Sequence, residues 1–478
     1  MIDSARVVCP LVGYTPLRDT ASGRSWVTLG GARHSIRSGE VHLTRFRPSV
    51  RMEGDIDRSA TGATSSRNDT STKSLSLIRQ RVFGGLWVGS TASSVGSSAG
   101  LVAINWLVYT VTGSAFDIAL VGVAGVIPRV IFGIFSGALA DRYNKLRLMI
   151  FSSYFRAATM VLLAAALVLY GFQLSLILAA VFVLGLGQSL FRPAINSLLP
   201  TAVPKEQLGS ANGLLTAAQS ATSILGSPLG GILIAAVGVA ATLAFNGASY
   251  LASALMLVLV SMSMTRPKDV HPGHREHPSF TQQLRGGFSY ISGERGLLKL
   301  TLASFGANFF LSLFFTFLVV YVSAVLHESA FVYGILGAAG GAGFGVGSLI
   351  VGRLHTERKF GVWFAVPWGV AGLGILGLVF FPGIVTGAVF LFALTFFGGL
   401  GNTTFFTGVQ RFVPHEVLGR YLSIDEVGSL AASPAGQVAG GIVIAAYGLG
   451  ADFVIAALGT AVFSFSLLLF SDVRSLRA

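Results

Sequence analysis

Several ionisable side chains lie in parts of the sequence that are otherwise apolar. Arg129 and Arg156 sit inside long runs of apolar residues, and Asp425 and Glu426 lie near the start of another. A guanidinium in such surroundings can bind a carboxylate or another electron-rich group, and a buried carboxylate can take up and release a proton near neutral pH. Because a charge in an apolar environment is costly, these residues are candidates for function. The two arginines favour an anionic or polar ligand over a simple lipophilic cation.

A second feature is the stretch "GALADRYNKLR", residues 137–147, in which charge follows directly on an apolar run. Its charged residues are Asp141, Arg142, Lys145 and Arg147. Basic residues at the end of an apolar helix can simply anchor that end. An acid has no such role, so Asp141 requires a further explanation.

Uncharged polar side chains also occur inside the apolar runs. We expect two or three of them to line a cavity. Any of them can instead form a hydrogen bond to a neighbouring helix, which stabilises the helix contact by about 0.6 kcal/mol on average. We rank Asn105 and Asn308 first, followed by Asn246 and Gln188.

The composition identifies the elements that hold these residues. Of the 478 residues 53% are hydrophobic and 11% are charged, with a mean hydropathy of +0.72, whereas soluble domains carry about 25% charged residues. Apolar runs of this length predict helices that cross a lipid bilayer, and the short alternating segments of a β-barrel are absent. The net charge of +13 then reflects basic loops rather than a nucleic-acid partner. The single cysteine, Cys9, allows no disulfide within the chain and no Cys-based metal site.

Twelve apolar runs predict an all-α polytopic membrane protein with twelve transmembrane helices. They cover about 84–110, 117–140, 147–170, 174–197, 211–236, 240–263, 298–323, 331–353, 361–382, 385–410, 421–447 and 450–471. Lys and Arg gather in the gaps after the even-numbered runs, and the intervening gaps contain neither. The positive-inside rule therefore predicts that both termini are cytoplasmic, in the cell membrane.

The array divides into two halves that resemble each other. "GGILIAAVGVA" at 230–240 matches "GGIVIAAYGLG" at 440–450, and the same offset of 210 aligns "VPKEQLG" at 203–209 with "VPHEVLG" at 413–419. We therefore predict an internal duplication, with six-helix halves at 81–263 and 298–478 joined by a cytoplasmic loop at 264–297. Such halves are related by an axis along the membrane normal and can enclose a central cavity. "HPGHREH" in the loop has the composition of a metal site, but a solvated, flexible loop is the better explanation.

The first 80 residues differ from the rest of the chain. They are polar and lack a long apolar run, which predicts a disordered cytoplasmic tail. Alternatively, translation begins downstream, for instance at Met52.

Together these residues resemble the major facilitator superfamily. The signature of this superfamily between helices 2 and 3 is Gly-x-Leu-Ala-Asp-Arg-x-Gly-Arg-Arg, which "GALADRYNKLR" matches closely. "WLVYTVTGSAFDIALVG", "FRPAINSLLPTAVPKEQLGSANGL" and "AFNGASYLASALML" are similar to its drug-exporter branch, which includes macrolide efflux proteins and the enterobactin exporter. The resemblance covers roughly residues 80 to 470.

The resemblance implies roles for the loop residues. Gly137 would allow close packing of helix 2, Asp141 would hold a cytoplasmic gate, and Arg142 and Lys145 would pair with carboxylates or helix ends. Two positions depart from the signature. Asn144 stands where the signature has glycine, and asparagine tolerates a left-handed turn better than other residues except glycine. Leu146 stands where the signature has a basic residue, and the sequence leaves open whether Arg147 takes over that role.

The fifth helix carries "GSPLGG", residues 226–231. It resembles the exporters' antiporter motif Gly-Pro-x-x-Gly-Gly with its proline displaced by one position. Pro228 would bend the helix, and Gly226, Gly230 and Gly231 would permit close packing. Tight packing alone, without a role in transport direction, also explains the motif. "SPAGQVAGG" at 433–441 is a looser echo of it.

The resemblance implies a secondary transporter that exports a small organic molecule, such as a drug, a macrolide-like compound or a siderophore-like metabolite, by alternating access. Proton coupling is implied by the family, with Asp425 and Glu426 as candidates; an acidic first helical turn is the alternative for this pair. An importer of the same fold is the main alternative, and an integral-membrane transferase is a remote one. We expect a monomer in membrane lipid with no cofactor, no metal and no enzymatic activity. The absence of a "GxxxxGK[ST]" sequence gives no support for drive by ATP.

Overall fold

The structure is a computed structural model that describes residues 25–29, 32–36, 77–204, 207–263, 291, 293–351, 354 and 359–474. Only the backbone is described at 25–29, 32–36, 133–142, 209, 216, 220, 223, 295, 412, 415, 416, 419, 420, 423 and 474.

The polar N-terminal segment contains one paired element that we did not predict. Strand β1, Ser25–Leu29, pairs antiparallel with β2, Ala32–Ile36. The chain separates into two compact units, Met1–Ser66 and Arg67–Ala478. All the helices described below belong to the second unit.

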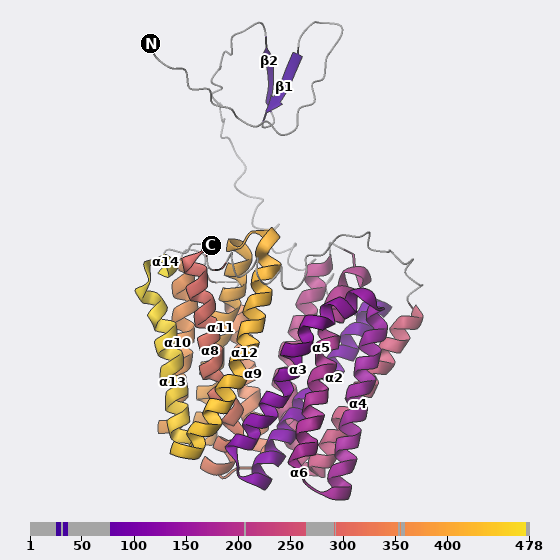
Figure 1. Ribbon diagram of the computed structural model, residues 1–478, viewed down its shortest axis with the longest axis vertical. Coiled ribbons are helices and arrows are strands. Elements are labelled where there is room, and N and C mark those ends of the chain that lie inside the picture. The colour runs from indigo at the N-terminus through magenta and orange to yellow at the C-terminus, as the bar shows by residue number, and fades with distance from the viewer. Residues whose placement is uncertain are drawn as a thin grey trace, which may run out of the picture. The chain divides into compact units, whose positions relative to one another are not determined.

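Long helices run back and forth through the second unit (Figure 1). The first half comprises α2 (Arg81–Thr112), α3 (Ala115–Arg142), α4 (Lys145–Tyr170), α5 (Leu174–Ala202) and α6 (Leu208–Ser263). The second half comprises α8 (Arg295–Val320) with the π-helical turn η2 (Tyr321–Val325), α9 (Ala330–Val351), α10 (Phe360–Phe380), α11 (Ile384–Phe412), α12 (His415–Tyr447), α13 (Leu449–Ser466), the short turn η4 (Leu467–Leu469) and α14 (Ser471–Arg474). We call the end of the bundle at which α2 begins and α14 lies the terminal end, and the opposite end the distal end.

The described residues contain eleven helices long and apolar enough to cross a membrane. One of them, α6, is 56 residues long and holds two crossings, because Gly238 interrupts it with a left-handed φ of 82° and a ψ of 173°. The predicted twelve-helix, all-α fold is therefore confirmed. Gly448, between α12 and α13, has a φ of 83° and a ψ of 168°. These two glycines are 210 residues apart, so the duplication inferred from the sequence appears in the backbone.

The two halves use equivalent helix contacts. Within the first half α2 packs on α6, and α3 packs on α5; within the second, α8 packs on α12, and α9 packs on α11. The main contacts between the halves join α6 to α9 and α12 to α3. At the offset of 210 these two interfaces correspond to each other.

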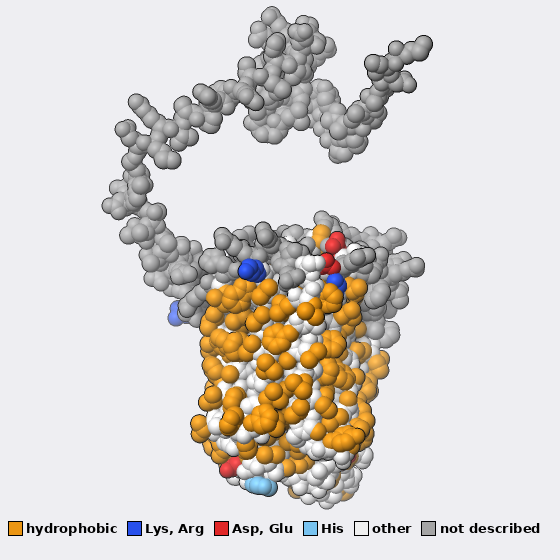
Figure 2. All heavy atoms as spheres, turned by 90° about the vertical axis from the view of Figure 1, so that its left-hand side faces the viewer, with side chains coloured by type: hydrophobic (Ala, Val, Ile, Leu, Met, Phe, Trp, Pro, Cys, Tyr) orange, Lys and Arg blue, Asp and Glu red, His pale blue; other side chains and the backbone are white. Residues whose placement is uncertain are grey.

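The outer surface of the bundle is apolar. Leu162, Leu169, Phe380 and Val385 are each at least two-thirds exposed. Figure 2 shows hydrophobic side chains covering the visible face of the helices, with charged side chains only near its two rims. This apolar belt fits a lipid environment, because exposed charge in hydrocarbon is costly.

Much of the predicted central loop lies outside the described residues. "HPGHREH", at 271–277, and most of "LRGGFSYI" belong to that part. Helix α8 begins at Arg295, near the boundary predicted at 298.

Candidate functional site

The loop between α3 and α4 holds the charged cluster. Only the backbone of Gly137, Asp141 and Arg142 is described. The Lys145 ammonium donates a hydrogen bond to the carbonyl oxygen of Ser197 at 3.1 Å. Lys145 therefore ties the start of α4 to the last turns of α5, and it contacts a helix end rather than a described carboxylate.

Asn144 has a different role from the expected one. Its φ is −62°, so the tolerance of asparagine for a left-handed turn is not used at this position. Its side-chain oxygen accepts hydrogen bonds from the backbone N–H groups of Leu146 at 3.0 Å and Arg147 at 3.2 Å. Asn144 thus caps α4, which typically stabilises a helix by about 1 kcal/mol. The Leu146 side chain is buried in an apolar cluster with Met149, whereas Arg147 is exposed.

Two glycines of "GSPLGG" pack against α2 in the same half. A Cβ atom at Gly226 would come within 2.6 Å of the Ser98 Cβ, and one at Gly230 within 2.8 Å of the Ala99 Cα. Neither distance is possible without movement of α2. The glycines are therefore required for this close helix approach.

The rest of the motif faces the other half. A Cβ at Gly231 would come within 2.5 Å of the Ala330 carbonyl oxygen and 2.9 Å of the Phe331 Cα, both on α9. From the α9 side, a Cβ at Gly334 would come within 2.9 Å of the Pro228 Cα. The motif thus lies where α6 of the first half crosses α9 of the second.

The echo at 433–441 makes the equivalent contacts. Gly436 packs on Phe309 and Ser312 of α8, as Gly226 packs on α2. A Cβ at Gly441 would come within 3.2 Å of the Phe116 Cα on α3 of the other half, as Gly231 approaches α9. Both inter-half junctions are therefore built from small residues at matching positions.

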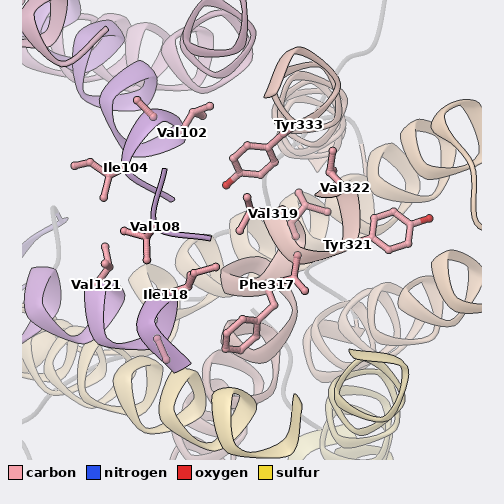
Figure 3. Packing of buried hydrophobic residues seen from close by; sticks show 14 of the residues in the cluster. Val102, Ile104, Val108, Ile118, Val121, Phe317, Val319, Tyr321, Val322 and Tyr333 are labelled. Atoms are coloured by element: carbon pink, nitrogen blue, oxygen red, sulfur yellow. The ribbon is translucent and has the colours of Figure 1, made fainter. Parts of the chain in front are cut away.

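These junctions belong to a core that the halves share at the distal end. One apolar cluster includes Val108 and Ile118 of the first half and Phe317 and Val319 of the second, and Figure 3 shows these side chains facing one another. The phenol of Tyr333 points from α9 toward α2, where it hydrogen bonds with the Asn105 side chain. Asn105, ranked first as a cavity residue, is thus part of this seal, and it is not among the described cavity-lining residues.

At the terminal end the described apolar clusters are separate. One contains only second-half residues, such as Leu300, Phe364 and Val409. Another contains only first-half residues, such as Met149 and Leu198. The halves therefore pack tightly at the distal end and have separate cores at the terminal end.

A cavity of about 630 Å³ lies within the first half, bounded by α2 to α6. Its lining runs from Asn212, near the start of α6, to Ile104 and Val181, in the distal part of the helices. This volume is in the usual range for small-molecule pockets. The cavity therefore extends from near the terminal end to the membrane-buried middle of the bundle.

Four of the residues predicted as cavity candidates line this cavity: Arg129, Arg156, Gln188 and Asn246. Arg192, in the terminal half of α5, lines it as well. The hydroxyl groups of α2 form much of the polar wall and were not predicted from the sequence: Ser90, Thr91, Ser93, Ser94, Ser97 and Ser98. The signal for them is the run "GSTASSVGSSAG" at 89–100.

A line of polar contacts joins α8 to α12 in the second half. Thr301 and Tyr421 share a hydroxyl–hydroxyl hydrogen bond of 2.9 Å. Farther along, the Asn308 amide donates to the Ser429 hydroxyl at 3.3 Å, and Asn308 is not among the described residues that line the cavity. Ser312 then donates to the Ser433 carbonyl oxygen at 3.0 Å.

Asp425 lies within this line of contacts. It is 6% exposed and bonds with Ser304 of α8, while its Oδ1 has no hydrogen-bond partner. The adjacent Glu426 is exposed. A second acid, Asp452, is fully buried in the first turn of α13 with neither oxygen bonded. The described acids within the membrane helices thus include two that are buried and incompletely hydrogen-bonded.

Residues 72–478 match the family described as transmembrane secretion effector. Macrolide efflux protein A of Streptococcus pyogenes is 23% identical over 71% of this chain and 83% of its own length. The MFS-type transporter YfiS of Bacillus subtilis, an uncharacterized protein, is 24% identical over 77% of this chain and 88% of its own length.

Solved structures of transporters share the fold. The nucleoside transporter NupG aligns with a TM-score of 0.68 at 11% identity, over 81% of this chain and 99% of that one. A bacterial homologue of the lysosomal transporter Spinster aligns with a TM-score of 0.65 at 13% identity, over 84% of this chain and 98% of that one. The chain therefore belongs to the transmembrane secretion effector family and is a multi-pass membrane transporter of the major facilitator superfamily.

Proposed function

We propose that this transporter exports a small organic molecule from the cytoplasm by alternating access. The observation that supports this most strongly is the asymmetry along the bundle axis. The halves share one core at the distal end, and the cavity extends toward the terminal end, where their cores are separate. Rocking of one half against the other would open the distal end and close the terminal end.

The terminal end is proposed to be cytoplasmic, in the cell membrane. Basic residues gather in the loops at that end, and the loops at the distal end, such as "TGSAFD" and "GLGAD", contain none. By the positive-inside rule the cavity then faces the cytoplasm in this structure. This is the state in which an exporter collects its substrate.

Export, rather than import, is supported by the relatives and by the motif of α6. Macrolide efflux protein A and the multidrug efflux pump Tap of Mycolicibacterium fortuitum, 25% identical over 37% of this chain and 44% of its own length, are both named for efflux. Gly231 and Pro228 lie where the halves must separate at the distal end. Drugs, macrolide-like compounds and siderophore-like metabolites are the proposed substrates.

The proton gradient is the proposed energy source. Asp425 is buried, can accept a proton at its free Oδ1, and lies among the polar contacts between α8 and α12. Glu426 is the exposed neighbour through which a proton could reach it. Asp141 is proposed as the gate residue of the cytoplasmic side, so Asp141→Asn should leave membrane insertion intact and slow transport.

Everted membrane vesicles, whose cytoplasmic face is outside, test the proposal. Vesicles that contain the protein are offered radiolabelled erythromycin and radiolabelled 2,3-dihydroxybenzoate, a siderophore building block, with and without a proton gradient. We expect accumulation of at least one compound inside the vesicles, and its loss when an uncoupler is added. Accumulation that ignores the uncoupler would contradict proton coupling, and uptake only into right-side-out vesicles would show import.

A further inference from the structure

Arg156 of α4 occupies an unusual position for a charged residue. It is 3% exposed, eleven residues from the start of its helix, which is about 16 Å along the axis at about 1.5 Å per residue. The guanidinium carbon lies 4.7 Å from the ring centre of Phe191 and 4.5 Å from that of Tyr250. Two aromatic rings thus fix the guanidinium in the middle of the membrane, next to the cavity.

The hydrogen bonds of Arg156 satisfy only part of its donor capacity. Its Nη1 donates to the Gln188 side-chain oxygen at 3.0 Å, and its Nε donates to the Ser152 carbonyl oxygen at 3.4 Å. The Tyr250 side chain also bonds with the guanidinium, whereas the Nη2 atom is buried and makes no hydrogen bond. Among the described residues, no carboxylate lies within 4 Å of this guanidinium. A buried cation without a counter-ion is costly. A negatively charged group bound at this site would therefore stabilise the guanidinium.

The surrounding cavity increases the positive charge. Arg129 and Arg192 line it together with Arg156, and the Nε of Arg129 is also buried without a partner. No acidic residue occurs among the described lining residues. A carboxylate that acts on Arg129 is Glu426, which lies on α12 in the other half. In a cleft with low-dielectric walls these three cations would attract an anion.

The cations belong to one half only. At the offset of 210, Arg129 corresponds to Ala339 and Arg192 to Asn402. The duplication therefore provides the scaffold in both halves, while the charges of the cavity are specific to the first. This difference favours a ligand-binding role, since a purely structural need would apply to both halves.

We propose that the first-half cavity binds an organic molecule through one oxyanion group, a carboxylate, phosphate or sulfonate, held by Arg156 and Arg129. A planar guanidinium can donate two parallel hydrogen bonds to such a group. The hydroxyl groups of α2, including Ser94 and Ser97, face the polar part of the ligand, and Ile104, Val181 and Leu184 face its apolar body. This assignment rests on the proposed function, for which it names the substrate class.

Equilibrium binding to the purified protein tests the assignment without transport. The protein is placed in nanodiscs of phosphatidylcholine and titrated calorimetrically with naphthalene-2-sulfonate and with the cation of matched shape, 2-naphthyltrimethylammonium. The anion should bind and the cation should not. Arg156→Gln should weaken binding of the anion by about 30-fold or more, and Arg156→Lys should restore part of it.

Two further variants keep the experiment decisive. Lys299→Gln removes a cation that pairs with Asp472 at 2.8 Å, away from the cavity, and should leave the affinity for the anion unchanged. If Arg156→Gln does not fold, Arg129→Gln provides the same test at a partly exposed position. Equal affinity for the two probes, or unchanged affinity for the anion in the folded cavity variant, would overturn the assignment.

The source of the oxyanion is resolved by the lipid. In nanodiscs that contain phosphatidylglycerol, the lipid can compete with the sulfonate for the site. Weaker sulfonate binding in these nanodiscs, by an effect that is absent in Arg156→Gln, would assign the site to a lipid headgroup. Unchanged binding would assign it to soluble organic anions. These titrations measure binding and not flux. A negative result would therefore overturn the oxyanion assignment without changing the result of the vesicle transport experiment.

Discussion

Asp425 shows how a single residue could connect proton movement to the bundle. Its carboxyl group is buried, bonded on one side to Ser304, and free at Oδ1. Asparagine has nearly the same shape and can keep the contact with Ser304, but it cannot titrate. The substitution therefore separates the proposed proton-dependent role of Asp425 from its packing.

We predict that Asp425→Asn abolishes accumulation driven by a proton gradient and preserves exchange of substrate down its own gradient. Both are measured in everted vesicles with the compound that the wild-type protein accumulates. Asp117→Asn, at the distal start of α3, is the matched control and should retain both activities. Gradient-driven accumulation by the Asp425 variant at the wild-type level would exclude this residue as the coupling acid.

Individual residues differed in how well the sequence predicted them. Arg129 and Arg156 stand out because a charge in an apolar run is visible without a structure. The role of Asn105 cannot be predicted from the sequence, because its contact with Tyr333 depends on which helix of the other half lies opposite. The serines of α2 were missed because single hydroxyls are common in membrane helices and gain meaning only when one face of a helix borders a cavity.

At the scale of helices, the crossing of α6 and α9 is one of the two main contacts that must break if the distal end opens. Gly231 lies against the backbone of Ala330 and Phe331, so there is no room for a side chain. Gly213, near the start of α6, has no atom within 4 Å of a Cβ position. The two glycines therefore form a matched pair for substitution.

We predict that Gly231→Leu costs about 1–3 kcal/mol in the closed distal state and shifts the protein toward a distally open one. Spin labels at Tyr170→Cys and Val385→Cys, both exposed near the distal ends of their helices, report the change in a Cys9→Ser background. The distance between the labels should increase in Gly231→Leu and stay unchanged in the matched control Gly213→Leu. An unchanged distance in the Gly231 variant would show that this crossing does not control the opening.

The sequence indicated the equivalence of the helices but not their contacts. The offset of 210 predicted that Gly231 and Gly441 correspond, and each approaches the other half of the molecule. The offset could not show which half each glycine faces, because both helices also pack within their own half. The capping role of Asn144 was not predicted for a related reason, since the same residue type serves left-handed turns and helix caps.

At the scale of the whole molecule, the twelve crossings follow from a simple constraint. In hydrocarbon every backbone group must bond within its own segment, so long apolar runs become helices and their number can be predicted. The state of the bundle cannot be predicted in this way. Whether the halves close at one end or the other depends on small differences between two sets of helix contacts, which hydropathy does not encode.

In this state, one cavity in the first half is proposed to open to the cytoplasm. Ser94 lines that cavity and, with Cys9→Ser as background, Ser94→Cys supplies a single thiol there. A membrane-impermeant maleimide should label it in everted vesicles and leave it unlabelled in right-side-out vesicles under the same conditions. Labelling from the right-side-out face alone would contradict the account.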